Sequence, residues 1–255
     1  MALINSSINR WLEEGRENPE GFWERAARDL HWFRTWDRVF EWEFPQFRWY
    51  VGGQTNLAYN ALDYHVKNGR GGQTALIYLN EGGERRLFTY ASLLYEVKRV
   101  AAALRGMGLN KGDRITIYMP TCAEAIILML AAVRIGAIHS VIFAGFGAKA
   151  LADRIEASGS RLVFTADVTY RKGKNVRLKE IVDESLQHAG DSVEHVVVLN
   201  RTAGDTPMKS QRDIPWEEFL ARAEGYDGDY ILMEANEPAF ILATSGTTAK
   251  PKLVI

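Results

Sequence analysis

The fold is decided by residues 114–143, RITIYMPTCAEAIILMLAAVRIGAIHSVIF, in which two apolar runs of strand length flank an apolar run of helix length. Pro120 stops the first run, and Thr121 and Glu124 have the spacing of a capping box, which favours the start of a helix. Two strands that are joined through a helix of this length pair in parallel. The stretch therefore predicts a strand over Arg114–Met119, a helix over Ala123–Ile135 and a buried strand over Ile138–Phe143.

The same alternation of strands and helices continues on both sides of this unit. Before it, Ala75–Leu79 has the pattern of a short strand, and Thr89 can cap a helix that ends near Gly106. We therefore predict an α/β fold of layered, mostly parallel sheets flanked by helices. After the unit, the predicted elements are helices over Lys149–Ser158, Val176–His188 and Trp216–Ala223 and strands over Arg161–Thr165 and His195–Leu199.

The first fifth of the chain has a different composition from the rest. Twelve of the 28 aromatic residues and six of the seven tryptophans lie in residues 1–50. Residues 5–50 predict two short amphipathic helices, the second with Pro19 in its first turn, and then an irregular segment over Trp36–Tyr50. We interpret this region as a helical arm that packs aromatic rings onto a neighbouring domain. A surface that stacks on carbohydrates or bases is the alternative, which the balanced charge of the chain disfavours.

Composition excludes several classes of protein. With 31 basic and 32 acidic residues, the net charge of −1 lacks the basic excess that a nucleic-acid partner requires. The N-terminus has no apolar run typical of a signal peptide, and Arg134, Gly136 and His139 interrupt the most apolar stretch, so we predict no membrane span. The single cysteine, Cys122, fits a reducing compartment, and we expect a buried residue rather than a reactive thiol. These features predict a cytoplasmic protein.

An anion-binding loop is predicted at residues 244–252, TSGTTAKPK, between a buried strand over Phe240–Ala243 and an apolar end over Leu253–Ile255. Hydroxyls and backbone N–H groups donate hydrogen bonds to phosphate oxygens, and lysine adds compact positive charge. Gly246 lets the backbone approach a ligand closely. The spacing is not that of a Walker loop, and a polar hairpin turn is the alternative interpretation.

This loop resembles the phosphate-loop signature of the adenylate-forming enzymes, a Thr/Ser/Gly-rich run that closes in Pro-Lys-Gly. Ala249 and Leu253 stand where glycine is usual, and both restrict the dihedral angles of the loop. The resemblance to the acetyl-CoA synthetase branch of this family covers essentially the whole chain. It implies an N-terminal extension over residues 1–62 and the first part of the AMP-binding domain over residues 63–255, truncated just after the phosphate loop. The other stretches that carry it are Gly52–Asp63, Val141–Ile155 and Thr165–Lys179.

The resemblance implies a two-step ligation. A short-chain carboxylate, acetate or similar, attacks ATP to give an acyl-adenylate and pyrophosphate, and the thiol of coenzyme A then displaces AMP to give acyl-CoA. Mg²⁺ is expected with the triphosphate. The residues that would hold the ATP phosphates are Thr244, Ser245, Gly246, Thr247, Thr248 and Lys252.

The resemblance also implies a coenzyme A site. Arg171 and Lys174 would hold the 3′-phosphate, and the basic stretch Thr169–Lys179 is consistent with that role because we expect it to open a helix near Asn175. Phe143, Ala144 and Gly145 would lie beside the adenine.

The same resemblance assigns no catalytic residue and no metal ligand to this chain. In the family, the carboxylate pocket, the Mg²⁺ carboxylate and the catalytic lysine of a small C-terminal domain follow the phosphate loop. We therefore expect that the remainder of the large domain and the C-terminal domain are missing here, and that these residues alone do not turn over.

Two other functions remain open from the residues themselves. Residues 145–150, GFGAKA, match the dinucleotide fingerprint G-x-G-x-x-A after a strand, and Asp167 lies about twenty residues further on, which is typical of an NAD-dependent dehydrogenase. This fingerprint does not open the sheet, and it leaves the loop at 244–252 unexplained. The second alternative is a module that binds a nucleotide or coenzyme A without turnover.

Overall fold

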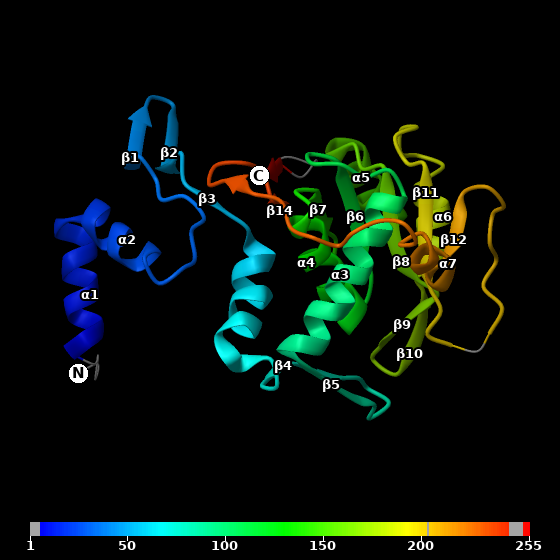
Figure 1. Cartoon of the computed structure of the whole chain (residues 1–255). Helices are drawn as coiled ribbons and strands as arrows, with labels where there is room; N and C mark the ends of the chain where they lie inside the picture. The colour runs from blue at the N-terminus through cyan, green and yellow to red at the C-terminus, as the bar shows by residue number, and fades with distance from the viewer. Residues whose placement is uncertain (1–5, 203, 245–251) are drawn as a thin grey trace.

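The computed structural model describes residues 6–202, 204–244 and 252–255, and its largest unit is a seven-stranded sheet (Figure 1). The strand order is β12-β11-β8-β6-β7-β14-β15. Every neighbouring pair is parallel except β14 with β15, which confirms the predicted α/β fold with a mostly parallel sheet. The strands are β6 (Arg114–Tyr118), β7 (Ile138–Val141), β8 (Leu162–Ala166), β11 (His195–Leu199), β12 (Asp213–Pro215), β14 (Phe240–Thr244) and β15 (Lys252–Val254).

The order of the strands makes this a doubly wound sheet. β7 lies on one side of β6, whereas β8, β11 and β12 extend the sheet on the other side. Counted from β6, the spatial order is therefore 2-1-3-4-5, the second common order of doubly wound folds. The switch point, at which successive connections turn in opposite directions, falls between β6 and β8.

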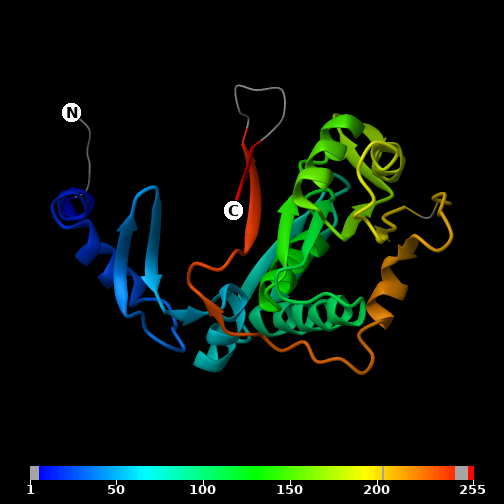
Figure 2. The ribbon, with the colours of Figure 1, turned by 90° about the horizontal axis from the view of Figure 1, so that it is seen from above.

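Two hydrophobic cores lie on the two faces of the sheet, each covered by helices (Figure 2). Ile115 and Ile117 of β6 belong to one core, and the neighbouring Tyr118 belongs to the other, because successive side chains of a strand point to opposite faces. The helices of the first core are α3 (Tyr90–Gly106), α4 (Ala123–Arg134) and α7 (Trp216–Ala221), and those of the second are α5 (Ala148–Ser158) and α6 (Leu178–Ser185).

The start of α3 follows its predicted cap, and the start of α4 does not. Thr89 accepts a hydrogen bond from the backbone N–H of Ser92 at 3.2 Å, which confirms the cap of α3. The prediction of a capping box at Thr121 and Glu124 is wrong. Cys122 is the N-cap of α4 and makes no side-chain hydrogen bond to the helix. The Glu124 carboxylate is paired instead with Arg86 of a neighbouring hairpin.

The N-terminal arm contains two helices and a hairpin, and it lies on the far side of β14 from the main body of the sheet (Figures 1 and 2). The irregular segment that we predicted over Trp36–Tyr50 is wrong. Phe40 pairs with Trp49 across the hairpin, with ring centroids 4.6 Å apart, so aromatic contacts between the strands replace a simple alternation of apolar and polar residues. The elements are α1 (Ser6–Glu17), α2 (Pro19–Ala27), β1 (Arg38–Glu43) and β2 (Gln46–Val51).

Two further hairpins stand beside the sheet. The predicted helix over Val176–His188 begins only at Leu178, because residues 174–177 pair with residues 168–171 as the second of these hairpins. The basic stretch is therefore a β-ribbon, and the helix start near Asn175 is wrong. The hairpins are β4 (Thr74–Leu79) with β5 (Arg85–Thr89) and β9 (Val168–Arg171) with β10 (Lys174–Arg177). The remaining elements are β3 (Gln54–Thr55), η1 (Tyr59–Asp63), η2 (Val66–Arg70) and β13 (Met233–Glu234), which pairs with β3.

β14 is less buried than predicted. Ile241 is buried, but Phe240 and Leu242 are exposed, because β14 pairs with β7 over only two residues and continues beyond it as a ribbon with β15. Among the described helices, none has both the length and the apolar composition that a membrane crossing requires.

Candidate functional site

Most of the predicted site residues lie at one edge of the sheet. Phe143 follows β7, Arg171 and Lys174 lie on the ribbon that follows β8, and Thr244 ends β14. Because β7, β8 and β14 run in the same direction, their carboxyl ends meet at the same edge. This is the edge at which open α/β sheets bind ligands.

Phe143 and Arg171 are in contact at this edge. The guanidinium carbon of Arg171 lies 5.4 Å from the ring centroid of Phe143, within the range of a cation–π interaction. A Cβ atom on Gly145 would collide with both side chains, so glycine allows their approach. Lys174 is the cross-strand partner of Arg171, and on that ribbon both are exposed. We call the set of Phe143, Ala144, Gly145, Arg171 and Lys174 the aromatic–cation surface.

A hydrogen bond from a buried tyrosine fixes the loop that carries Phe143. The hydroxyl of Tyr118, at the end of β6, donates to the backbone carbonyl of Phe146 at 2.6 Å. Burial raises the pKa of Tyr118 to about 12, so this hydroxyl is a neutral donor at physiological pH. Arg154 of α5 stacks on the ring of Phe146 at 4.5 Å, and the Phe146 N–H donates to the Phe143 carbonyl at 3.0 Å. Sequence reasoning missed Tyr118, whose one signal is a polar hydroxyl at the end of an apolar strand.

Only the two ends of the predicted phosphate loop belong to the described residues. Thr244 and Lys252 face each other in the antiparallel ribbon β14–β15, and the Thr244 hydroxyl donates to the Lys252 carbonyl at 3.3 Å. Both are exposed. The other predicted ligands, Ser245, Gly246, Thr247 and Thr248, lie outside the described residues, as does Ala249.

β14 is attached to the sheet beside a buried histidine. The ring of His139 in β7 stacks on Phe240 of β14, with centroids 5.7 Å apart and an interplanar angle of 16°. Burial lowers the pKa of His139 to about 4, so the ring is neutral at pH 7 and packs as an aromatic group.

The residues of the dinucleotide fingerprint are engaged in structural roles. Asp167 is buried, and its carboxylate accepts hydrogen bonds from the backbone N–H groups of Val168, Arg201 and Thr202 and from the Thr202 hydroxyl. A carboxylate so occupied is poorly suited to bind a ribose. Cys122 is buried as predicted, and burial raises the pKa of its thiol to about 12, which contradicts the alternative of a lowered-pKa thiol.

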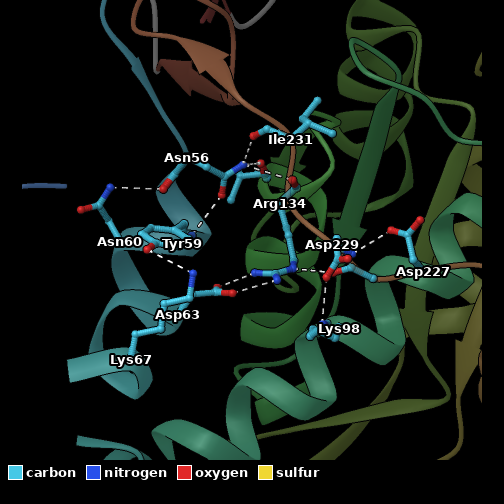
Figure 3. A network of polar contacts seen from close by, with 12 residues as sticks. Asn56, Tyr59, Asn60, Asp63, Lys67, Lys98, Arg134, Asp227, Asp229 and Ile231 are labelled. Carbon is cyan, nitrogen blue, oxygen red and sulfur yellow. Dashed lines mark hydrogen bonds and ion pairs between the residues drawn. The ribbon is translucent and has the colours of Figure 1, made fainter. Parts of the chain in front are cut away.

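A buried polar network joins the base of the N-terminal arm to the sheet domain (Figure 3). Arg134, at the end of α4, is fully buried and binds the Asp63 carboxylate through both terminal nitrogens, at 2.6 and 3.0 Å. Its Nε donates to the carbonyl of Gly228 at 2.6 Å. The side-chain amide of the buried Asn56 donates to the carbonyls of Val133, Arg134 and Ile231. The network ties together three segments that are far apart in sequence.

These features define the class of protein. It is a doubly wound α/β domain with an exposed aromatic and cationic surface at the carboxyl edge of its sheet. The family described as AMP-binding enzyme matches residues 63–255, and the chain belongs to it. A second family, described as acetyl-coenzyme A synthetase N-terminus, matches residues 8–61. The resemblance drawn from the sequence is thereby confirmed.

Several curated proteins are similar along nearly the whole chain. The acetyl-coenzyme A synthetase of Deinococcus radiodurans is 45% identical over 98% of this chain, and that of Rubrobacter xylanophilus is 43% identical over 95%. The 3-hydroxypropionyl-coenzyme A synthetase of Metallosphaera sedula is 47% identical over 94%. The chain spans 36–38% of the length of these relatives.

Proposed function

We propose that this chain contributes the coenzyme A surface and the phosphate loop of an AMP-forming acyl-CoA synthetase, an acid–thiol ligase. The observation that carries the proposal is the contact of Phe143 with Arg171 across Gly145. It joins a flat aromatic ring to a permanent cation on an exposed surface, which suits a ligand that combines a purine with a phosphate. Similarity over nearly the whole chain to coenzyme A synthetases supports the same reading.

The proposed reaction has two steps. A carboxylate oxygen attacks the α-phosphorus of ATP, the bond to the bridging oxygen breaks, and pyrophosphate leaves. The sulfur of coenzyme A then attacks the acyl carbon, and AMP leaves with the electron pair of the mixed anhydride. The loop residues Thr244 to Thr248 and Lys252 would stabilise the charge of the leaving pyrophosphate. Arg171 and Lys174 would hold the 3′-phosphate of coenzyme A during the second step.

The acid substrate is a short-chain carboxylate. Relatives of nearly equal identity are named for acetyl and for 3-hydroxypropionyl groups, so acetate and its small homologues are the compounds to test first. Among the residues that the structure describes, no group of three or more His, Cys, Asp or Glu side chains is suited to hold a metal ion. As the family resemblance implies, Mg²⁺ would accompany ATP, bound to the phosphate oxygens.

We expect that the 255 residues expressed alone do not complete the ligation. The family places the acid pocket and the catalytic lysine after the phosphate loop, and the chain spans 38% of its Deinococcus radiodurans relative. Mixing the purified chain with ATP, Mg²⁺ and acetate should release no pyrophosphate above the level of a heat-denatured sample. Sustained pyrophosphate release would contradict this expectation. If no pyrophosphate is released, these residues by themselves bind ligands without turnover.

Binding of coenzyme A tests the proposal directly. Titration calorimetry on the purified chain should show tighter binding of coenzyme A than of dephospho-coenzyme A, which lacks the 3′-phosphate. The double variant Arg171→Ala/Lys174→Ala should lose about 100-fold or more in affinity for coenzyme A, since each of the two charge-assisted bonds contributes about 1.5–3 kcal/mol when it is well formed.

The matched control is Lys149→Ala, an exposed lysine at the start of α5 that has no part in the aromatic–cation surface. It should leave both affinities unchanged. The double variant should also bind coenzyme A and dephospho-coenzyme A equally well. Equal binding of the two ligands by the unaltered chain would overturn the assignment of the basic pair.

A further inference from the structure

A cavity of about 650 Å³ lies beside the aromatic–cation surface, and no role has been assigned to it. Its volume is in the range of sites that bind small organic molecules. The hairpins β4–β5 and β9–β10 line two of its sides. Tyr170 and Arg171 are consecutive on β9 and point to opposite faces of the ribbon, so Tyr170 lines the cavity while Arg171 contacts Phe143. The ribbon is therefore a shared wall between two surfaces.

The cavity lies at the switch point of the doubly wound sheet. Cys122 follows β6, Tyr170 lies on the ribbon after β8, and Arg201 follows β11, and all three line the cavity. β6, β8 and β11 are neighbours in the sheet and run in the same direction. Connections that diverge at a switch point open a crevice outside the carboxyl ends of the strands, and ligands bind there. The position of the cavity is thus the one that the topology favours for a ligand.

Arg201 supplies the cavity with a positive charge that pairs with no acidic residue in the described part of the chain. Its terminal nitrogens donate to the Tyr78 hydroxyl at 3.2 Å and to the Val168 carbonyl at 3.3 Å, and its guanidinium carbon lies 5.3 Å from the ring centroid of Tyr170. Within the described part of the chain, no carboxylate oxygen lies within 4.0 Å of this guanidinium. Both of these acceptors are neutral, so no described residue forms an ion pair with the guanidinium, and the two bonds use only two of its five N–H groups.

The backbone holds Arg201 firmly in place. Its N–H donates to Oδ1 of the buried Asp167 at 3.0 Å, and the next residue, Thr202, donates to Oδ2 at 2.9 Å. The stack on Tyr170 and the bond to the nearly buried Tyr78 fix the side chain as well. An arginine that is already ordered loses little entropy when it binds a planar or tetrahedral oxyanion.

The other charged groups limit what the cavity can accept. The Glu124 carboxylate is paired with Arg86, and Lys172 is exposed at the tip of the β9–β10 ribbon. Glu81 and Glu84 are exposed at the turn between β4 and β5, where they would repel a highly charged ligand such as a nucleoside triphosphate. Burial keeps the Cys122 thiol neutral at pH 7, with a pKa raised to about 12, so it does not compete with an anion.

We propose that this cavity binds a small molecule through a single oxyanion group, a carboxylate or a phosphate, which is held by Arg201 and Lys172 at a site separate from the aromatic–cation surface. Arg201 binds the oxyanion through its free N–H groups, and Lys172 adds charge from the ribbon. The site does not depend on the proposed coenzyme A binding, because the two sets of residues do not overlap.

Titration calorimetry with inorganic phosphate and, separately, with propionate tests the site on the whole chain and distinguishes the two oxyanions. At least one of them should bind with a dissociation constant of about 1–10 mM, a weak affinity typical of a single charged contact. Arg201→Gln should weaken this binding about tenfold or more, and Lys172→Gln about two- to fivefold, because each loses a charge-assisted bond.

The matched control is Lys149→Ala, an exposed lysine outside both sites, which should bind the oxyanion as the unaltered chain does. The double variant Arg171→Ala/Lys174→Ala is measured beside it. Circular dichroism checks that Arg201→Gln is folded; if it is not, the effect of Lys172→Gln decides the question. The proposal is overturned if neither anion binds at about 50 mM, well above the expected constant. It is also overturned if a folded Arg201→Gln binds with unchanged affinity. Loss of binding only in the double variant would place the anion on the aromatic–cation surface instead.

Discussion

Replacing Arg134 by methionine lowers the free energy of unfolding by about 3–5 kcal/mol, the cost of removing one partner of a buried ion pair. Methionine fills much of the space of the arginine stem but leaves the Asp63 carboxylate, whose side chain is 10% exposed, without its two donors. The carbonyl of Gly228 loses its bond from Nε as well. Chemical denaturation at pH 7, followed by circular dichroism, measures the change.

Two variants isolate the buried pair as the cause. Arg28→Met removes an exposed pair with Glu24 and should change the stability by less than about 1 kcal/mol. The double variant Asp63→Leu/Arg134→Met should recover part of the loss, because replacing both charges by apolar groups leaves no unpaired ion. A loss below about 1 kcal/mol in Arg134→Met would show that the pair contributes no more than a surface contact does.

Replacing Asp213 by asparagine should lower the free energy of unfolding by about 2–4 kcal/mol at pH 7. The Asp213 side chain is fully buried and pairs with Lys179 at 2.7 Å and with Arg212 at 2.6 Å. Lys179 is itself 1% exposed, so the variant leaves a buried cation with Asp183 as its remaining carboxylate. The exposed pair of Arg177 with Glu180 supplies the control, since Glu180→Gln should change the stability by less than about 1 kcal/mol.

The effect of Asp213→Asn depends on pH in a known direction. Burial by itself would raise the pKa of Asp213, but hydrogen bonds from Arg212 and Lys179 outweigh it and hold the pKa below its ordinary value of 3.8. The unfolded chain therefore binds the proton more readily, and the contribution of Asp213 is present above pH 3.8 and is lost as the pH falls through the lower folded value. The difference between the two proteins should shrink in that acidic range. A difference that grows there would mean that the carboxylate is not the stabilising form.

The sequence predicted the elements whose apolar residues follow a clear period and missed those that do not. β6 and α4 are mainly apolar because they are buried in the sheet and against it, and β7 extends the same buried region. β9–β10 is a two-stranded ribbon that is largely exposed and carries polar and charged residues, so no hydrophobic alternation marks it. Similarly, aromatic residues on both strands hide the period of β1–β2.

The site could be predicted from the sequence only where a pattern is local. Thr244–Lys252 is a continuous signature, whereas the approach of Phe143 to Arg171 depends on two loops that a parallel sheet brings together. Residue chemistry alone identified Phe143 only as the end of a strand. The family resemblance is what placed Phe143 and Arg171 in one coenzyme A site. Arg201 carries no local signal at all, because the lack of an ion pair with any described residue is a property of its surroundings in three dimensions.

The buried network around Arg134 also bears on how the chain unfolds. The two family matches meet between residues 61 and 63, inside the π-helical turn Tyr59–Asp63. Asn56 and Asp63, on either side of that junction, both bind the end of α4. The boundary between the matched segments is therefore not a linker. We expect the base of the arm and the end of α4 to open together as one cooperative unit, with amide hydrogens that exchange at similar rates.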